Sequence, residues 1–198
     1  MKNGKINFLG LVLFSFAFYI LPFIFSKSKH MRPHLSRVPE FFHNYIKLVP
    51  EDDLMTSFKN QTNVLFDFLE TIPAQKINYA YAPGKWTIKE MLQHMIDAER
   101  IFCYRALRFA RKDPTPLHGF DENLFAKNAK ADKRKWNDLV EEFKSVRKAT
   151  EWLFGSFDQE QLEATGTSNN SSNYVLAFGY ISIGHSLHHV KIIKERYL

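Results

Sequence analysis

Four long stretches of the sequence carry apolar residues at intervals of three and four, the repeat of a helix with one buried face. The first opens at Pro50 and stops at Pro73, because proline cannot continue a helix. Two more occupy the middle of the chain, and the fourth runs from Tyr174 to near the C-terminus. We find no convincing β-hairpin, internal repeat or glycine-rich phosphate loop. The sequence therefore predicts an all-α fold, a four-helix bundle.

The ends of the middle helices can be placed from their capping residues. Thr87, followed three residues later by Glu90, forms a capping box and predicts a helix to about Ala110. Asp132 is the expected N-cap of the third helix, which ends at Gly155. We expect seven of its residues to face the core: Trp136, Leu139, Val140, Phe143, Val146, Trp152 and Leu153.

The connections between the helices differ in length. Residues 111–131 form a long connection, and segments of that length are usually lids or crossovers. Residues 156–173 are expected to form a short helical turn followed by a plain loop, because this segment ends in a run of glycine, serine, threonine and asparagine.

The N-terminal segment, residues 1–30, is a separate unit. Residues 6–25 are almost wholly apolar and, as a helix, would cover about 30 Å, the thickness of a bilayer core. Two interpretations stay open: a membrane anchor, or upstream sequence that is absent from a mature protein starting at Met31. Residues 31–49 are an irregular lead-in, and residues 50–198 form the bundle domain.

The basic residues argue against a nucleic-acid partner. Six of the 27 lie within residues 1–39, before the first acidic residue, Glu40. The remaining 21 equal the number of acids, so the bundle domain lacks the excess positive charge that phosphate binding requires.

The single cysteine, Cys103, excludes an internal disulfide and fits a reducing compartment. We therefore expect a cytoplasmic protein, with membrane attachment only through residues 6–25.

Three histidines point towards one interior. His185 and His189 are four residues apart, so they project from the same face of the last helix. That face also carries Phe178, Ile181 and Ile192. His94 shares its face of the second helix with Met91, Ala98 and Ile101. Buried imidazoles need partners, and one divalent metal ion satisfies all three while leaving open positions for water or substrate.

The simpler alternative is that these histidines are hydrogen-bonded core residues. His188 points about 60° away from His185 and is not expected to be a ligand. Acidic side chains nearby could orient an imidazole, but such acids more often pair with lysine or arginine, so none is assigned: Glu90, Asp97 and Glu99. Cys103 is expected to be a buried, inert thiol.

Two motifs resemble the DinB-like (damage-inducible) family. They are Pro83-Gly-Lys-Trp-Thr-Ile-Lys-Glu90 followed by His94, and Gly184-His-Ser-Leu-His-His-Val190. Residues 119–123, Gly-Phe-Asp-Glu-Asn, also resemble a crossover loop of some members. The resemblance covers about residues 50–198. It implies an up-down-down-up bundle, often a homodimer, with a divalent metal on His94, His185 and His189.

The resemblance also implies a chemistry. Characterised relatives include thiol-dependent S-transferases and isomerases, in which the metal activates a low-molecular-weight thiol. We therefore expect a metal-dependent enzyme, with Zn or Ni activating a thiol or water for transfer to, or hydrolysis of, a small electrophile. A non-catalytic metal-binding or dimeric sensor bundle remains the alternative.

Overall fold

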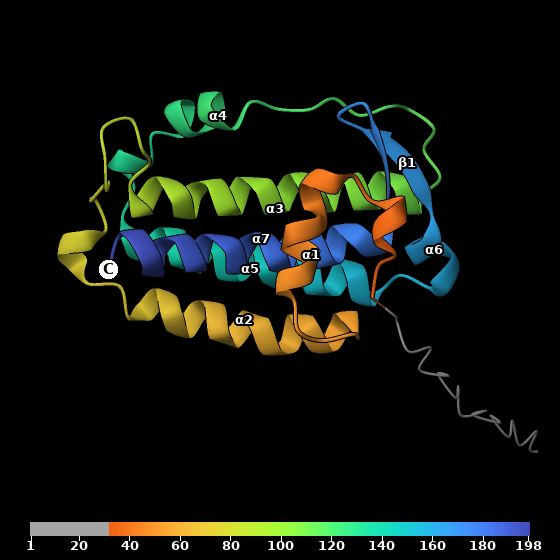
Figure 1. Cartoon of the computed structure of the whole chain (residues 1–198), viewed down its shortest axis with the longest axis horizontal. Helices are drawn as coiled ribbons and strands as arrows, with labels where there is room; N and C mark the ends of the chain where they lie inside the picture. The colour runs from red at the N-terminus through yellow and green to blue at the C-terminus, as the bar shows by residue number, and fades with distance from the viewer. Residues whose placement is uncertain (1–31) are drawn as a thin grey trace, which may run out of the picture.

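The computed structural model describes residues 32–198, and its four longest helices form the predicted bundle (Figure 1). These helices are α2 (Leu54–Glu70), α3 (Ile88–Ala110), α5 (Trp136–Gly155) and α7 (Val175–Arg196). Within residues 32–198, no helix has the length and apolar character needed to cross a bilayer. The interpretations of residues 1–30, including an anchor at 6–25, lie outside the described residues.

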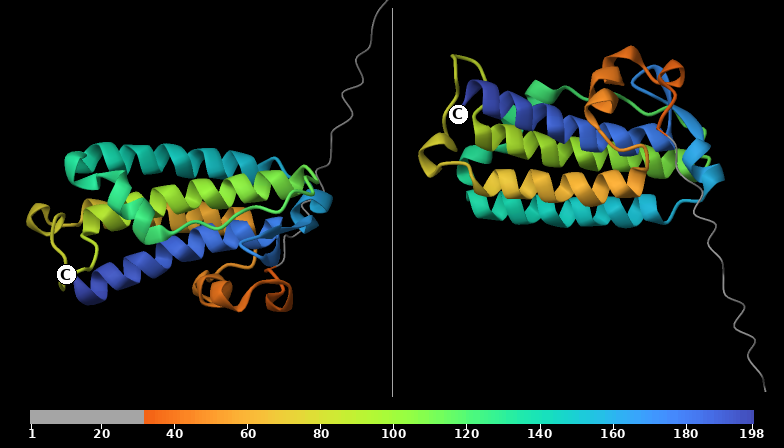
Figure 2. Two further views of the ribbon diagram at one scale, coloured as in Figure 1. Left: turned by 90° about the horizontal axis from the view of Figure 1, so that it is seen from above. Right: turned by 60° about the horizontal axis from the view of Figure 1, so that its bottom comes forward.

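The helices run up, down, down and up, as the family resemblance implied (Figure 1). Helix α3 packs between α7 and α5, and α2 closes the ring on the other side. The parallel step from α3 to α5 requires a crossover, which residues 111–135 supply. The crossover contains α4 (Glu122–Ala129) and a 3₁₀ turn at Ala131–Lys133. Figure 2 shows it passing over α3 and α7, where it covers the region between them.

Local capping explains most of the helix ends. The Thr87–Glu90 capping box is present at the start of α3, and the Asp53 carboxylate accepts a hydrogen bond from the Thr56 amide at the start of α2. The predicted Asp132 cap is wrong. Asp132 lies in the preceding 3₁₀ turn, and α5 begins at Trp136 without a side-chain cap.

The predicted core face of α5 is correct at its centre and wrong at Trp152. Leu139 and Phe143 are fully buried, but the Trp152 side chain is 72% exposed. Lys148 lies over the Trp152 ring at 5.5 Å, so this indole packs against a surface ammonium group instead of the core.

The segment 156–174 holds a β-hairpin that the sequence analysis missed. After α6 (Gln159–Glu163), strands β1 (Thr165–Ser168) and β2 (Ser171–Tyr174) pair antiparallel. Asn169 and Asn170 join them with φ values of 49° and 57°. A two-residue hairpin turn of type I′ needs positive φ at both positions, which asparagine tolerates. The polar strands carry no apolar alternation, so the pattern resembled a loop.

The lead-in is also more ordered than predicted. It forms two 3₁₀ turns (Leu35–Arg37 and Glu40–Phe42) and helix α1 (His43–Leu48), which lies against the outer side of α7 (Figure 2). Arg32 fixes the end of this segment by donating to the carbonyl oxygens of Ile46 at 3.1 Å and Val49 at 2.6 Å. Because α1 covers the outer face of α7, residues 175–186 of α7 are buried on all sides.

The approach of α1 to α7 depends on Gly184. A Cβ atom at this position would lie 2.0 Å from the Tyr45 carbonyl oxygen. We expect Gly184→Ala to destabilise the protein by about 1–3 kcal/mol, because a backbone group must move. Helix propensity alone favours alanine by about 1 kcal/mol, so a net loss would identify the clash.

Thermal unfolding and limited proteolysis measure this effect. We expect a lower Tm and faster cleavage within residues 32–49. Gly155→Ala is the matched control, since its Cβ would meet only the flexible Met55 side chain at 3.4 Å. Equal Tm values for Gly184→Ala and the unaltered chain would contradict the prediction.

Candidate metal centre

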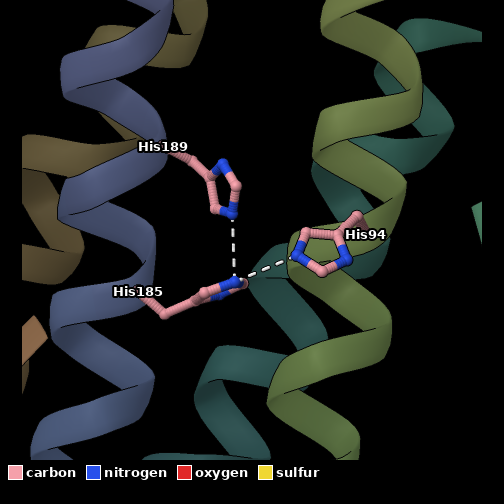
Figure 3. Close-up of side chains that lie close together, drawn as sticks. All are labelled: His94, His185 and His189. Atoms are coloured by element: carbon pink, nitrogen blue, oxygen red, sulfur yellow. Dashed lines mark hydrogen bonds between the residues drawn. The ribbon is translucent and has the colours of Figure 1, made fainter. Parts of the chain in front are cut away.

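The three predicted histidines meet between α3 and α7 (Figure 3). His185 is central: its Nε2 atom lies 3.0 Å from Nε2 of His94 and 3.0 Å from Nε2 of His189. All three side chains are buried, and one nitrogen from each lies within 4.8 Å of the others. The helical spacing predicted that these three histidines lie on the inward faces of two helices, and the structure places their side chains together.

Hydrogen bonding alone does not satisfy this arrangement. An imidazole nitrogen has one in-plane position, which holds either a proton or a lone pair. Nε2 of His185 can therefore make a good hydrogen bond to only one of its two neighbours. Three lone pairs directed at a shared cation remove this conflict. Nitrogens of a tetrahedral site with metal–nitrogen bonds of about 2.0–2.1 Å lie about 3.3 Å apart, close to the spacing here.

Burial keeps the rings in the neutral form that binds metals. Desolvation lowers the pKa of His94 to about 4. Desolvation also holds the pKa values of His185 and His189 well below 6.5, and the neighbouring imidazoles add to the effect. A cationic ring is therefore unfavourable in this cluster.

These pKa shifts predict an acid-sensitive metal-free protein. Below pH 6.5 the unfolded chain binds protons at these histidines and the folded chain does not, so stability falls as the pH decreases. For His94, whose pKa falls from 6.5 to about 4, the loss reaches about 3 kcal/mol at pH 4. Urea unfolding of chelator-treated protein between pH 7.5 and pH 4 measures it. His94→Gln should flatten this pH dependence, and identical profiles would contradict the assignment.

The histidine cluster opens into a cavity of about 270 Å³. Aromatic side chains surround the imidazoles: the ring centroids of Trp86 and His94 are 4.8 Å apart, and those of Tyr45 and His185 are 5.4 Å apart. The lead-in, α3, the crossover, the hairpin and α7 all contribute to the lining: Pro39, Phe41, Phe42, Tyr45, Trp86, His94, Ala98, Phe102, Arg105, Phe120, Glu122, Ser168, Asn169, Ser171, His185 and His189.

The other candidate residues lie outside this cluster. Glu90 belongs to the capping box, and Glu99 pairs with Arg147, as the simpler interpretation of these acids expected. Asp97 accepts a hydrogen bond from Gln93. Cys103 contacts the Thr150 hydroxyl, and burial raises the pKa of its thiol to about 12, so the inert role is supported. His188 packs against Tyr45 and contributes no nitrogen to the cluster.

Sequence reasoning missed the walls of the cavity. The lead-in and the hairpin supply Tyr45, Ser168 and Asn169, and α3 supplies Arg105. For Arg105 a signal existed, since it follows His94 by eleven residues and therefore lies on the same helix face. The lead-in and the hairpin residues reach the cavity through tertiary contacts that leave no periodic pattern.

Comparisons with known proteins agree with this fold. The family model described as the DinB superfamily matches residues 57–193. Among solved structures, the chain is similar to YfiT from Bacillus subtilis, described as "a probable metal-dependent hydrolase with an unusual four-helix bundle topology". The TM-score is 0.64 at 13% identity, over 72% of this chain and 82% of that chain, which shows a shared fold. No curated protein matches the chain in sequence.

Proposed function

This chain belongs to the DinB superfamily, and on that premise we propose that it is a metal-dependent enzyme acting on a small electrophile. His94, His185 and His189 hold a divalent ion, with Zn or Ni preferred because imidazole nitrogens suit both. The reaction is hydrolysis by water or S-transfer from a low-molecular-weight thiol. The observation that carries the proposal is the convergence of three buried Nε2 atoms at the inner end of a cavity.

The ion supplies Lewis acidity, which makes a deprotonated water or thiol available at neutral pH. The chain supplies the ligands and the surroundings. Burial keeps the three imidazoles neutral, so they offer lone pairs without proton release at neutral pH. With three protein ligands, positions remain for the nucleophile and the substrate, which is the arrangement of a catalytic site.

The cavity walls set the conditions for the reaction. Phe42, Trp86 and Phe102 are apolar, so they exclude bulk water and strengthen electrostatic interactions at the inner end. Burial, with the negative charge of Glu122, raises the pKa of the Tyr45 phenol. Tyr45 therefore stays protonated at neutral pH and can donate a hydrogen bond to a developing negative charge.

The test begins with elemental analysis of the purified full chain, where we expect about one divalent ion per chain. Metal-loaded and chelator-treated samples are then assayed with p-nitrophenyl acetate, with and without bacillithiol or cysteine. Metal-dependent turnover without thiol supports hydrolysis, and thiol-dependent consumption supports S-transfer. Protein that binds no ion at micromolar concentrations contradicts the proposal, and metal-loaded protein without either activity favours the non-catalytic alternative.

A further inference from the structure

Arg105 is a buried cation in the wall of the same cavity. Its side chain comes from α3, and the residue is only 4% exposed. Its Nη2 atom donates to the His118 carbonyl oxygen in the crossover, at 3.2 Å. Neither Nε nor Nη1 has a hydrogen-bond partner within residues 32–198, and Nε is fully buried. Part of the hydrogen-bonding capacity of this guanidinium is therefore unused.

The charge of Arg105 is also only partly offset by its described neighbours. No carboxylate in the described part of the chain lies within ion-pair distance of its guanidinium. The acid that acts on it electrostatically is Glu122, an exposed residue at the start of α4 that also lines the cavity. A buried, unpaired guanidinium is costly, so an incoming anion gains a strong, charge-assisted interaction there.

Arg105 is the only lysine or arginine among the cavity-lining residues of the described chain. The remaining lining is aromatic, apolar or neutral, apart from Glu122 and the histidines. An anion that enters the metal-free cavity therefore meets one guanidinium among the described lining residues, that of Arg105.

The positions along α3 define the shape of a ligand. Arg105 follows His94 by eleven residues, which places the two Cα atoms on one face and about 16 Å apart along the axis. Helical side chains lean towards the N-terminus, which is the direction of His94 from Arg105, and both residues line the same cavity. Between the two lie Ala98, which is small, and Phe102, which is aromatic. The cavity therefore joins a cationic end to the imidazole cluster through an apolar floor.

We propose that Arg105 binds the carboxylate of a small organic acid whose apolar or aromatic middle lies over Ala98 and Phe102. This proposal deepens the proposed function by naming a class of substrate. It rests on that function for one point only, namely that the reactive group at the other end of the acid faces the ion held by the histidines. Substrates are then carboxylate-bearing electrophiles, and neutral analogues of the same shape bind more weakly.

The test uses 4-methylbenzoate and its neutral isostere 4-methylbenzamide with the full chain at pH 8. Calorimetry gives the affinity of each probe for metal-loaded and chelator-treated protein. We expect 4-methylbenzoate to bind about 10- to 100-fold tighter than the amide, in both samples. A preference that appears only in metal-loaded protein would mean that the carboxylate binds the ion, and it would overturn the proposal.

Three variants assign the preference to Arg105. Arg105→Gln should remove it, and Arg105→Lys should keep part of it, because a point charge replaces the guanidinium fork. Arg100→Gln is the matched control: it removes a positive charge from the same helix, but Arg100 is half exposed and pairs with Glu142 outside the cavity. Equal preference in Arg105→Gln and the unaltered chain would overturn the proposal.

Glu122→Gln provides a second test of the proposal, which stays informative even if the Arg105→Gln variant fails to fold. Removing this exposed negative charge should tighten 4-methylbenzoate binding by about threefold and leave the amide unchanged. Unchanged binding of both probes would count against the proposal. Metal content is measured on the same samples, so a carboxylate preference in protein that never holds an ion would refute the proposed function and support the Arg105 site.

Discussion

Replacing His185 by alanine is expected to abolish stoichiometric metal binding. His185 has the central position, since its Nε2 atom lies 3.0 Å from Nε2 of both other histidines. Without it, two nitrogens remain, one from each of two helices, and a pair of ligands holds a divalent ion poorly. We expect the affinity to fall by more than about 100-fold, beyond the loss typical of residues that only support a ligand. Elemental analysis after gel filtration measures the loss.

His188→Ala is the matched control for this variant. His188 is a neighbouring residue in α7, but its ring packs against Tyr45 and His189 and contributes no nitrogen to the cluster. The His188→Ala variant should retain about one ion per chain. Thermal unfolding gives a second readout, because an ion present at 1,000 times its dissociation constant stabilises the fold by about 4 kcal/mol. Chelator should lower the Tm of the control and leave that of His185→Ala unchanged. Equal metal content in His185→Ala and the unaltered chain would refute the ligand assignment.

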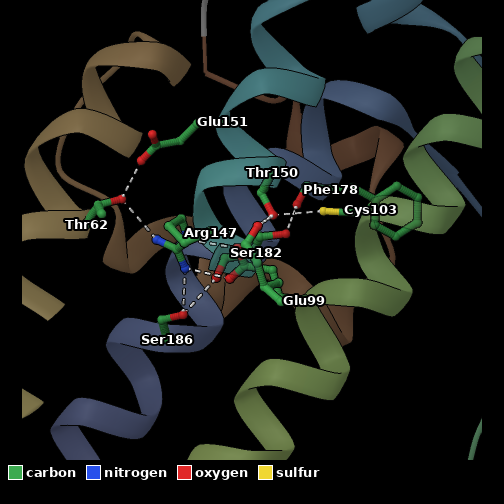
Figure 4. Close-up of polar contacts among 10 residues, drawn as sticks. Thr62, Glu99, Cys103, Arg147, Thr150, Glu151, Phe178, Ser182 and Ser186 are labelled. Atoms are coloured by element: carbon green, nitrogen blue, oxygen red, sulfur yellow. Dashed lines mark hydrogen bonds and ion pairs between the residues drawn. The ribbon is translucent and has the colours of Figure 1, made fainter. Parts of the chain in front are cut away.

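A second large effect is expected at the buried ion pair of Glu99 and Arg147 (Figure 4). Arg147 Nε and Nη2 donate to the two Glu99 carboxylate oxygens at 2.8 and 2.7 Å, and both residues are 1% exposed. Nη2 also donates to the Ser186 hydroxyl at 3.0 Å, and Nη1 lies 3.5 Å from the Thr62 hydroxyl. One guanidinium thus contacts side chains from the three other helices of the bundle.

Glu99→Gln should destabilise the protein by about 3–5 kcal/mol, because it leaves the Arg147 charge buried without its counterion. Urea and thermal unfolding measure the effect, and the Tm should fall by roughly 10 °C. Lys148→Met is the control, since the adjacent, exposed Lys148 makes only surface contacts, with Glu151 and the Trp152 ring, and should cost less than about 1 kcal/mol.

The double variant Glu99→Leu/Arg147→Met tests the cause of that loss. With both charges replaced by apolar groups, much of the lost stability should return, because the penalty of an unpaired buried charge disappears. A double variant as unstable as Glu99→Gln would show that the hydrogen bonds, and not charge compensation, dominate here. Arg147, the partner of Glu99, also donates to Ser186, the residue that follows His185 in α7. We therefore expect Glu99→Gln to weaken metal binding as well.

The bundle was predictable because its information is local. The apolar repeat of α2, α3, α5 and α7, the Thr87 capping box and the prolines act over a few residues each. Elements held by distant contacts were missed. Helix α1 is only six residues long and depends on Arg32 and on the Gly184 surface of α7. The hairpin depends on two asparagines at positive φ and on pairing with Leu117 of the crossover.

In the candidate site too, the part fixed by local spacing was predictable and the part fixed by distant contacts was not. Helical spacing and the inward faces of two helices identified His94, His185 and His189, because the period of a helix fixes which residues share a face. Whether a buried polar side chain has a partner is decided in three dimensions. The sequence therefore could not show that Arg147 meets Glu99 whereas Arg105 retains unused donors. Those two arginines look alike in a helical repeat, and only packing distinguishes them.

The wide separation of the ligands along the chain affects when the centre can exist. His94 and His185 are 91 residues apart, and two of the three nitrogens belong to the last helix. During synthesis, α7 must leave the ribosome before the ion finds its full set of donors. Any product truncated before α7 keeps one histidine of the three. Occupancy by the ion thus reports that α7 has been synthesised and has packed against α3.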